Sequence, residues 1–201
     1  MASPPLTKIL EAALLAAGEP LPLERLQELF PEAERPSRAE LRQALAELAE
    51  QLAGRSIELK EVASGYRLQV RREFSPWVSR LWEERPTRYS RALLETLAVI
   101  AYRQPVTRAE IEEIRGVSIG TPIIRTLQER EWIRVVGHRD VPGRPAMYGT
   151  TKQFLDYFNL KSLSELPTLL ELRSLADHPA LDLRFPEEGA RAAPQDDDER
   201  T

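Results

Sequence analysis

The sequence predicts a mostly helical α+β protein built from two tandem winged-helix domains. Three observations predict this fold: apolar residues recur at helical spacing, capping residues or glycines mark most helix ends, and one order of elements occurs twice. That order is three short helices followed by a β-hairpin, which is typical of a winged helix. A chain of 201 residues is long enough for two such domains.

The first copy begins with two helices. Leucine, isoleucine and alanine recur at i, i+3 and i+4 over residues 6–17, and Gly18 ends this helix. A second, short helix is expected over residues 23–29, where leucine occurs every third residue, and it should end before Pro31.

The first copy continues with a third helix and a hairpin. Ser37 and Glu40 have the spacing of a capping box, so the third helix begins there, and Gly54 closes it. Apolar and polar residues alternate over residues 57–70 on both sides of Ser64-Gly65, which predicts a β-hairpin.

A linker of about residues 74–89 separates the copies. Its large apolar residues follow helical spacing and are Phe74, Trp77, Val78, Leu81 and Trp82. This spacing predicts a short amphipathic helix that closes the first domain and ends at Pro86. We expect Trp77 and Trp82 to pack against a domain face.

The second copy repeats the helices. Its first helix begins at Ser90 and breaks near Gln104-Pro105. Thr107 and Glu110 have the spacing of a second capping box, and the short helix that they begin ends at Gly116.

The rest of the second copy contains the third helix and the wing. The third helix begins at Thr121-Pro122, because proline suits the first helical turn. A strand over residues 132–136 and its partner over 146–150 form the hairpin. One more helix follows Thr151, and the polar tail from about Pro186 is expected to be disordered.

The two copies can be superimposed at a constant offset of 85 residues. Apolar residues and one proline then coincide in the pairs Ile9–Leu94, Ala12–Leu97, Leu15–Ile100, Pro20–Pro105, Leu21–Val106, Leu26–Ile111 and Leu29–Ile114. The sequence identity between the copies is low, so the pattern indicates a repeated architecture.

Composition argues against an enzyme, a metal centre and a membrane segment. The chain has no cysteine and two histidines, so thiolate nucleophiles and cysteine-based zinc sites are excluded. It contains neither a P-loop nor a G-x-G-x-x-G motif. No apolar stretch reaches the roughly 18–20 residues of a membrane span, and Glu11 interrupts any secretory signal. We therefore expect a non-enzymatic, cytoplasmic protein without cofactor or metal.

Charge favours a protein-binding function over DNA reading. Residues 1–80 carry 11 basic and 12 acidic side chains, residues 88–158 carry 11 and 8, and residues 159–201 carry 5 and 10. The third helix of the first copy exposes Glu40, Glu47 and Glu50, which phosphate would repel. The wing nevertheless offers Arg139 and Arg144, so a winged-helix DNA-binding transcriptional regulator remains the alternative.

Three sequence blocks resemble the segregation and condensation protein B family. They are "LETLAVIAYRQPVTRAEIEEIRGV" from Leu94, "IIRTLQEREWI" from Ile123 and "VGHRDVPGRPAMYGTTKQFLDYFNLKSLSELP" from Val136. Together they cover about a third of the chain. The first copy resembles the family mainly in architecture, and the acidic tail does not resemble it.

This resemblance implies a subunit of the bacterial SMC complex that binds no ATP and no metal. Such a subunit forms a homodimer chiefly through its N-terminal domain and binds the central segment of the kleisin, segregation and condensation protein A. Through the kleisin it is connected to the SMC ATPase, and its contact with DNA is indirect or weak. The complex condenses and segregates chromosomes, so the resemblance implies a cytoplasmic, nucleoid-associated protein.

The resemblance also implies boundaries and candidate residues. Residues 1–85 would be the dimerisation domain, 86–167 the kleisin-binding domain and 168–201 an acidic tail. Within the family motif, the candidates for partner binding are Tyr102, Arg103, Arg115, Arg125, Arg144 and Tyr148. We expect a groove between the helices and the wing of the second domain to accept an amphipathic kleisin helix.

Overall fold

A computed structural model of the protein describes residues 4–81 and 89–168. The described residues up to Leu166 form one compact unit. The described chain is rich in helix and contains two small antiparallel sheets, so the predicted α+β class is confirmed. Trp82, Pro86 and the tail from Pro186 lie outside the described residues.

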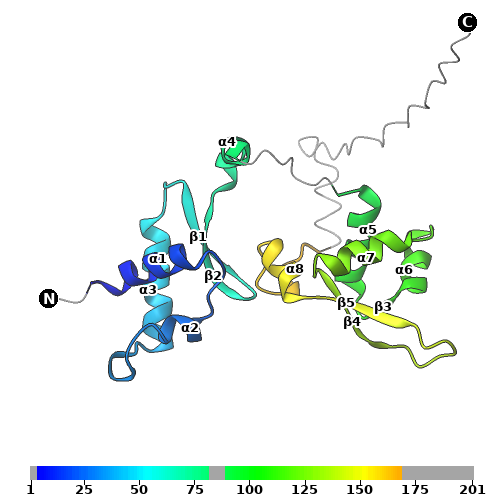
Figure 1. Cartoon of the computed structure of the whole chain (residues 1–201), viewed down its shortest axis with the longest axis horizontal. Coiled ribbons are helices and arrows are strands. Elements are labelled where there is room, and N and C mark those ends of the chain that lie inside the picture. The colour runs from blue at the N-terminus through cyan, green and yellow to red at the C-terminus, as the bar shows by residue number, and fades with distance from the viewer. Residues whose placement is uncertain (1–3, 82–88, 169–201) are drawn as a thin grey trace, which may run out of the picture. The chain divides into compact units, whose positions relative to one another are not determined.

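The N-terminal half, residues 4–81, contains three helices and then a hairpin (Figure 1). Its elements are α1 (Leu6–Ala17), α2 (Leu23–Gln27), α3 (Arg38–Gln51), β1 (Ile57–Val62) and β2 (Gly65–Val70). The short 3-10 turn η1 (Glu32–Glu34) lies between α2 and α3. This is the predicted order of elements.

Helix ends in this half follow local chemistry. Gly18 takes the left-handed conformation that ends α1, at φ 65°. Ser37 and Glu40 form both hydrogen bonds of the predicted capping box at the start of α3. The expected extension of α2 to Leu29 is wrong, because α2 ends at Gln27 and Leu29 is exposed. Pro31 disfavours helical geometry in Phe30 and lacks the N–H that would donate to the Gln27 carbonyl, so α2 is not extended toward Pro31.

The β1–β2 hairpin packs closely against the segment before α2. Leu21 forms a β-bridge with Tyr66, with both backbone hydrogen bonds present at 2.8 and 2.9 Å. Gly65 has φ 138°, and a Cβ at this position would lie 2.2 Å from the Leu21 carbonyl oxygen. Glycine is required here both by its backbone conformation and by the space available.

After β2 the chain forms η2 (Arg72–Phe74), the single helical turn α4 (Ser75–Val78) and η3 (Ser79–Leu81). The amphipathic helix predicted in the linker thus exists in part. Its expected packing is wrong for Trp77, whose exposed fraction is 66%. Leu81 is 77% exposed. The core of this half is already filled by α1, α2, α3 and the hairpin, so these side chains find no buried position.

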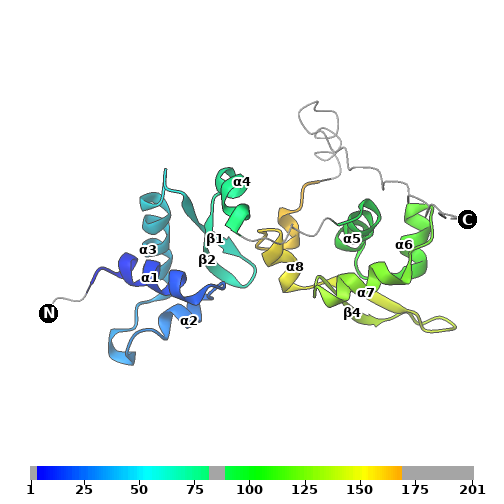
Figure 2. The same ribbon diagram turned by 45° about the horizontal axis from the view of Figure 1, so that its top comes forward.

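The C-terminal half, residues 89–168, repeats the order of three helices and a hairpin (Figure 2). Its elements are α5 (Arg91–Arg103), β3 (Val106–Thr107), α6 (Arg108–Arg115), α7 (Thr121–Glu129), β4 (Ile133–His138), β5 (Ala146–Thr150), α8 (Lys152–Tyr157) and η4 (Leu163–Glu165). The strands form one sheet in the order β3-β5-β4. The loop between β4 and β5 projects beyond the helices in Figures 1 and 2.

The predicted caps of this half are confirmed. The Ser90 hydroxyl accepts a hydrogen bond from the Leu93 amide, and Thr107 and Glu110 form the second capping box. Gly116 ends α6 at φ 72°. Strand β3 was not predicted, because a two-residue strand is too short to show alternation.

The repeat extends to the strand pairing. In the N-terminal half Leu21 pairs with Tyr66, and in the C-terminal half Val106 pairs with Tyr148. Leu21 and Val106 are also partners at the offset of 85 residues. The segment between the first two helices therefore joins the hairpin in the same way in both halves.

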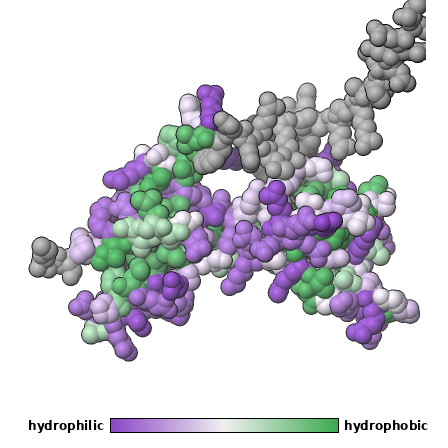
Figure 3. All heavy atoms as spheres, viewed as in Figure 1, coloured by the Kyte–Doolittle hydropathy of each residue, from purple (hydrophilic) through white to green (hydrophobic). Residues whose placement is uncertain are grey.

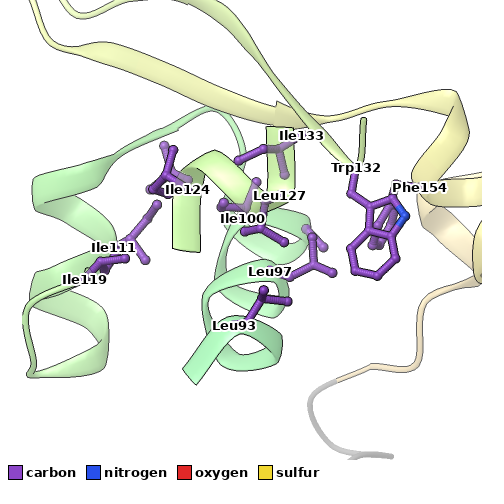
Figure 4. Packing of buried hydrophobic residues seen from close by; sticks show 12 residues of the cluster. Leu93, Leu97, Ile100, Ile111, Ile119, Ile124, Leu127, Trp132, Ile133 and Phe154 are labelled. Atoms are coloured by element: carbon purple, nitrogen blue, oxygen red, sulfur yellow. The ribbon is translucent and has the colours of Figure 1, made fainter. Parts of the chain in front are cut away.

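Each half has its own hydrophobic core. In the N-terminal half the buried residues are Leu10, Leu14, Leu26, Leu41, Ala44, Leu45, Leu48 and Leu52. In the C-terminal half Ile111 and Ile119 lie at one end of the cluster, with Trp132 and Phe154 at the other (Figure 4). Tyr89, Tyr157 and Phe158 surround Trp132, with ring centroids 4.6 to 5.4 Å from its own. The division into two winged-helix domains stays a prediction.

Candidate functional site

The wing of the C-terminal half is a hairpin whose loop is closed by backbone hydrogen bonds. The Arg144 amide donates to the Val141 carbonyl, and the Arg139 amide donates to the Pro145 carbonyl, both at 2.9 Å. Gly143 and Arg144 have φ of 84° and 39°. The residues that make the reversal are thus fixed by turn geometry, which leaves the Val141 and Arg144 side chains exposed.

One of the two wing arginines is engaged inside the domain. Arg139 forms an ion pair with Glu110, whose carboxylate also accepts a hydrogen bond from the Thr107 amide in the capping box of α6. The backbone N–H of Thr107 lowers the pKa of Glu110 most strongly, and the Arg139 guanidinium lowers it further. Arg139 therefore ties the wing to α6, and less of its charge is available for phosphate.

The Tyr102–Pro105 motif joins the end of α5 to β5. The side-chain oxygen Oε1 of Gln104 accepts hydrogen bonds from the backbone N–H of Thr150 at 2.8 Å and from the Thr150 hydroxyl at 3.2 Å. The side-chain NH2 group of Gln104 donates to the backbone carbonyl of Ala101 and to the Thr150 hydroxyl. A Cβ on Gly149 would lie 2.9 Å from Oε1 of Gln104. Gln104 and Gly149 thus act together in the fold.

The six predicted partner-binding residues do not form one cluster. Arg103 lies exposed at the end of α5, Arg125 on α7 and Arg144 at the wing. Arg125 forms an i,i+4 ion pair with Glu129 at 2.7 Å, in which both side chains are more than half exposed. Such a pair stabilises the helix by less than about 1 kcal/mol and leaves both groups open to a partner.

The other three candidates are more enclosed. The Arg115 side chain is 8% exposed and forms an ion pair with Glu95 of α5 at 3.1 Å. Tyr148 lies on β5 and packs against the core, and Tyr102 is half-buried on α5. The positions of Arg115 and Tyr148 are explained by packing between elements of the same half.

A shallow groove lies between the end of α7, β4 and the start of α8. Its volume is about 520 Å³, and it is lined by Gln128, Glu131, Ile133, Arg134, Val135, Thr151, Lys152 and Gln153. Ile133 is buried, whereas Val135 is 42% exposed. One exposed apolar side chain, Val135, thus lies beside a rim that carries both charge signs, an arrangement compatible with an amphipathic helix.

None of the six candidates lines this groove, and the expected kleisin groove between the helices and the wing stays a prediction. The one sequence signal for this surface is a pair of adjacent valines, Val135 and Val136, in the expected strand. A strand in a small domain normally turns alternate residues away from solvent, yet these two side chains are 42% and 45% exposed. The register shift between Val135 and Gly137 breaks that alternation, and sequence alone does not show such a bulge.

A second candidate surface lies on α1 in the N-terminal half. This helix carries two charged residues, Lys8 and Glu11, which pair with one another at 2.8 Å. Ala12, Leu15 and Ala16 are exposed, with Leu15 at 70%. Figure 3 shows hydrophobic residues gathered on the face of this half over α1. A helix that is apolar on nearly all sides normally has partners on more than one side.

The described residues contain no group of three or more histidine, cysteine or acidic side chains arranged to hold a metal ion. Within the same residues, no helix is long and apolar enough to cross a membrane. The acidic side chains with lowered pKa values, such as Glu95, Glu112 and Glu61, are paired with arginine, lysine or backbone N–H groups. These shifts follow from helix and loop structure.

Residues 8–169 match the family model described as segregation and condensation complex subunit ScpB. A segregation and condensation protein B homolog of Coxiella burnetii is 60% identical over 83% of this chain and 80% of its own length. The corresponding protein of Syntrophotalea carbinolica is 49% identical over 85% of both chains. A solved dimer of the ScpB N-terminal domain complexed with ScpA peptide is 25% identical over 42% of this chain and all of that chain, with a TM-score of 0.36.

Proposed function

The chain belongs to the family of the segregation and condensation complex subunit ScpB, and from this we propose that it is a non-enzymatic subunit of a bacterial SMC–kleisin complex. It dimerises and binds the central region of the kleisin, segregation and condensation protein A. Through the kleisin it supports chromosome condensation and segregation at the nucleoid, in the cytoplasm. The observation that carries this proposal is the family match over residues 8–169.

The proposed division of labour follows the two cores. Residues 1–85 form the dimerisation domain, residues 86–167 the kleisin-binding domain, and residues 168–201 the tail. The separate hydrophobic clusters of the two halves support a boundary in the linker between them.

The kleisin-binding surface is the groove between α7, β4 and α8. Val135 is a suitable anchor because its side chain is apolar, 42% exposed and held on a strand. Arg134 and Lys152 on the rim can pair with acidic residues of a kleisin helix, while Glu131 can pair with a basic one. Apolar anchors give such a contact its affinity, and rim charges give it orientation.

Co-purification of the full chain with the cognate kleisin tests this surface. The substitution Val135→Asp would bury an unpaired charge when the kleisin binds. A loss of binding free energy of about 1.4 kcal/mol or more is expected, which weakens kleisin binding at least about tenfold. Val141→Asp is the matched control, because Val141 has a similar exposure of 47% but lies in the wing loop. Equal loss, or no loss, in the two variants would place the kleisin elsewhere.

The proposed dimer contact is the exposed side of α1. Ala12 and Ala16 have small side chains, so another helix can approach closely, and Leu15 between them can be buried on contact. Light scattering on the full chain should give a dimer for the wild type and a monomer for Leu15→Glu. Leu29→Glu, a control on an exposed leucine outside α1, should remain dimeric. A dimeric Leu15→Glu would exclude α1 as the interface.

Direct DNA reading is not part of the proposal. Arg125 of α7 is paired with Glu129, and Arg139 of the wing is paired with Glu110. Helix α3, at the position of a recognition helix, exposes Glu47 and Glu50. A DNA-binding regulator would show an affinity that falls steeply with salt concentration. A gel-shift titration at low salt should show weak binding or none.

A further inference from the structure

Polar contacts connect the turn of the β1–β2 hairpin with the chain around the end of α8. The backbone N–H of Ala63 donates to the Leu160 carbonyl at 3.0 Å, and that of Ser64 donates to a carboxylate oxygen of Asp156 at 3.0 Å. We call these contacts and the two described next the clasp. Its residues are Glu61, Ala63, Ser64, Arg67, Asp156, Asn159, Leu160 and Lys161.

Arg67 supplies the third contact of the clasp. Its guanidinium donates to the Asp156 carbonyl at 3.0 Å and to the Asn159 side-chain oxygen at 2.8 Å. The last carbonyls of a helix have no partner within the helix, so a cation at this end is favourable. Arg67 on β2 therefore completes the end of α8, a helix of the other half of the chain.

The fourth contact is an ion pair between Glu61 and Lys161, 2.6 Å apart. The Tyr66 hydroxyl also donates to Glu61 at 2.9 Å, and burial followed by this carboxylate raises the pKa of Tyr66 to about 12. The hydrogen bond from Lys161 most strongly lowers the pKa of Glu61, and Glu61 raises the pKa of Lys161. Both charges are therefore maintained at neutral pH.

Two residues near the end of α8 are unusual for their local structure. Asp156 is a buried carboxylate in the last turn of a helix, where the helix dipole disfavours negative charge. Asn159 has φ 59°, a conformation in which glycine is the least strained residue. Both choices are explained by the clasp, because Asp156 accepts from Ser64 and Asn159 accepts from Arg67.

The clasp differs in kind from the cores that it joins. Its contacts are hydrogen bonds and an ion pair, whereas each half is held by its own apolar cluster. Breaking the clasp would therefore leave both cores packed, and contacts of this type open at a small cost in free energy compared with global unfolding. The hairpin side is held firmly, since Gly65 packs against the Leu21 carbonyl.

We propose that the clasp is a conformational latch that closes within one chain and sets the angle between the two halves. When the latch is closed, a partner that touches both halves meets a preset arrangement of their surfaces, which reduces the entropy cost of binding. When it opens, the halves move as separate folded bodies. The latch is a property of the free chain and does not depend on kleisin binding.

Cross-linking of the wild-type protein with a zero-length carbodiimide tests whether the clasp is closed within one chain. It should join the Lys161 amine to the Glu61 carboxylate, which mass spectrometry detects as one linked peptide pair in the monomer band of a denaturing gel. Lys161→Arg keeps the charge and removes the amine, so this link should disappear. Linked peptides found in a dimer band alone would overturn closure within one chain, as would the absence of this link in the wild type.

The latch itself is tested by distances between spin labels. The chain has no cysteine, so Glu50→Cys and Glu113→Cys introduce one exposed label in each half. Labelled chain is diluted with unlabelled chain so that distances within a chain dominate. A single narrow distance distribution is expected, and it should broaden at least about twofold in Glu61→Lys and in Asn159→Gly.

Charge exchange distinguishes the latch from general damage. Glu61→Lys combined with Lys161→Glu restores opposite charges and should return the narrow distribution. Asn159→Gly removes one of the two acceptors of Arg67 near the end of α8 without straining the backbone, so its far-ultraviolet circular dichroism should match that of the wild type. A wild-type distribution as broad as those of the variants would refute the latch, and so would variants as narrow as the wild type.

Discussion

The hydrogen bonds of Gln104 lead to the sharpest prediction for stability. Replacing Gln104 with alanine removes the acceptor of the Thr150 amide and the donor to the Ala101 carbonyl. An enclosed backbone N–H that loses its partner costs about 1–3 kcal/mol. Gln104 and Thr150 are half-buried, so we expect Gln104→Ala to lower the free energy of unfolding of the C-terminal half by about 2 kcal/mol.

Urea denaturation followed by Trp132 fluorescence measures this effect. Trp132 is 2% exposed in the core of the C-terminal half, and replacing Trp77 and Trp82 with phenylalanine makes it the single tryptophan. With an m-value of about 1–2 kcal/mol/M, a loss of about 2 kcal/mol shifts the midpoint by about 1–2 M. The m-value itself should not change, because the native state stays compact.

Gln43→Ala is the matched control. Gln43 is exposed on α3 and makes one side-chain hydrogen bond, to Glu47 at 3.1 Å. Trp132 does not report on this half, so far-ultraviolet circular dichroism follows its unfolding. The replacement should change the stability of the N-terminal half by less than about 0.5 kcal/mol. If Gln104→Ala destabilised the C-terminal half no more than Gln43→Ala destabilises the N-terminal half, the connection between α5 and β5 would not be a source of stability.

Three further predictions concern single residues. Gly65→Ala should destabilise the N-terminal half by more than about 3 kcal/mol in thermal unfolding, because its Cβ has no space beside Leu21, while Gly143→Ala in the open wing should cost about 1 kcal/mol. Leu97→Ala should cost about 2–5 kcal/mol in urea, since Leu97 is 3% exposed in the C-terminal core. The pKa of Glu110 is lowered in the folded state, so its contribution to stability is present above the unfolded pKa and is lost as the pH falls through the folded pKa. Urea midpoints between about pH 6 and pH 3 should therefore fall less for Glu110→Gln than for the wild type, and parallel curves would contradict this.

The sequence by itself determined the local structure of this protein. Ser37 and Thr107 began helices because their hydroxyl oxygens accept backbone N–H groups within the same turn. Gly18 and Gly116 ended helices because glycine adopts positive φ without strain. These rules act over three or four residues, so the order of elements, and with it the repeat, could be predicted.

The tertiary structure decided which apolar side chains are buried. Trp77 follows helical spacing with Phe74 and Leu81, yet it is exposed, because spacing defines a face but does not supply the surface that covers it. The six predicted partner-binding residues come from the three sequence blocks that resemble the family, and the fold distributes them over several elements. On β4 both Val135 and Val136 are exposed, next to a register shift that local sequence does not reveal.

Contacts between distant residues were also decided by the tertiary structure. Gln104 and Thr150 are 46 positions apart, and Ser64 and Asp156 are 92 apart. No local rule connects them, since each pair is brought together by the packing of whole helices and strands. The sequence therefore determined the elements and the family of this protein, and the tertiary packing determined its surfaces and the clasp that joins its halves.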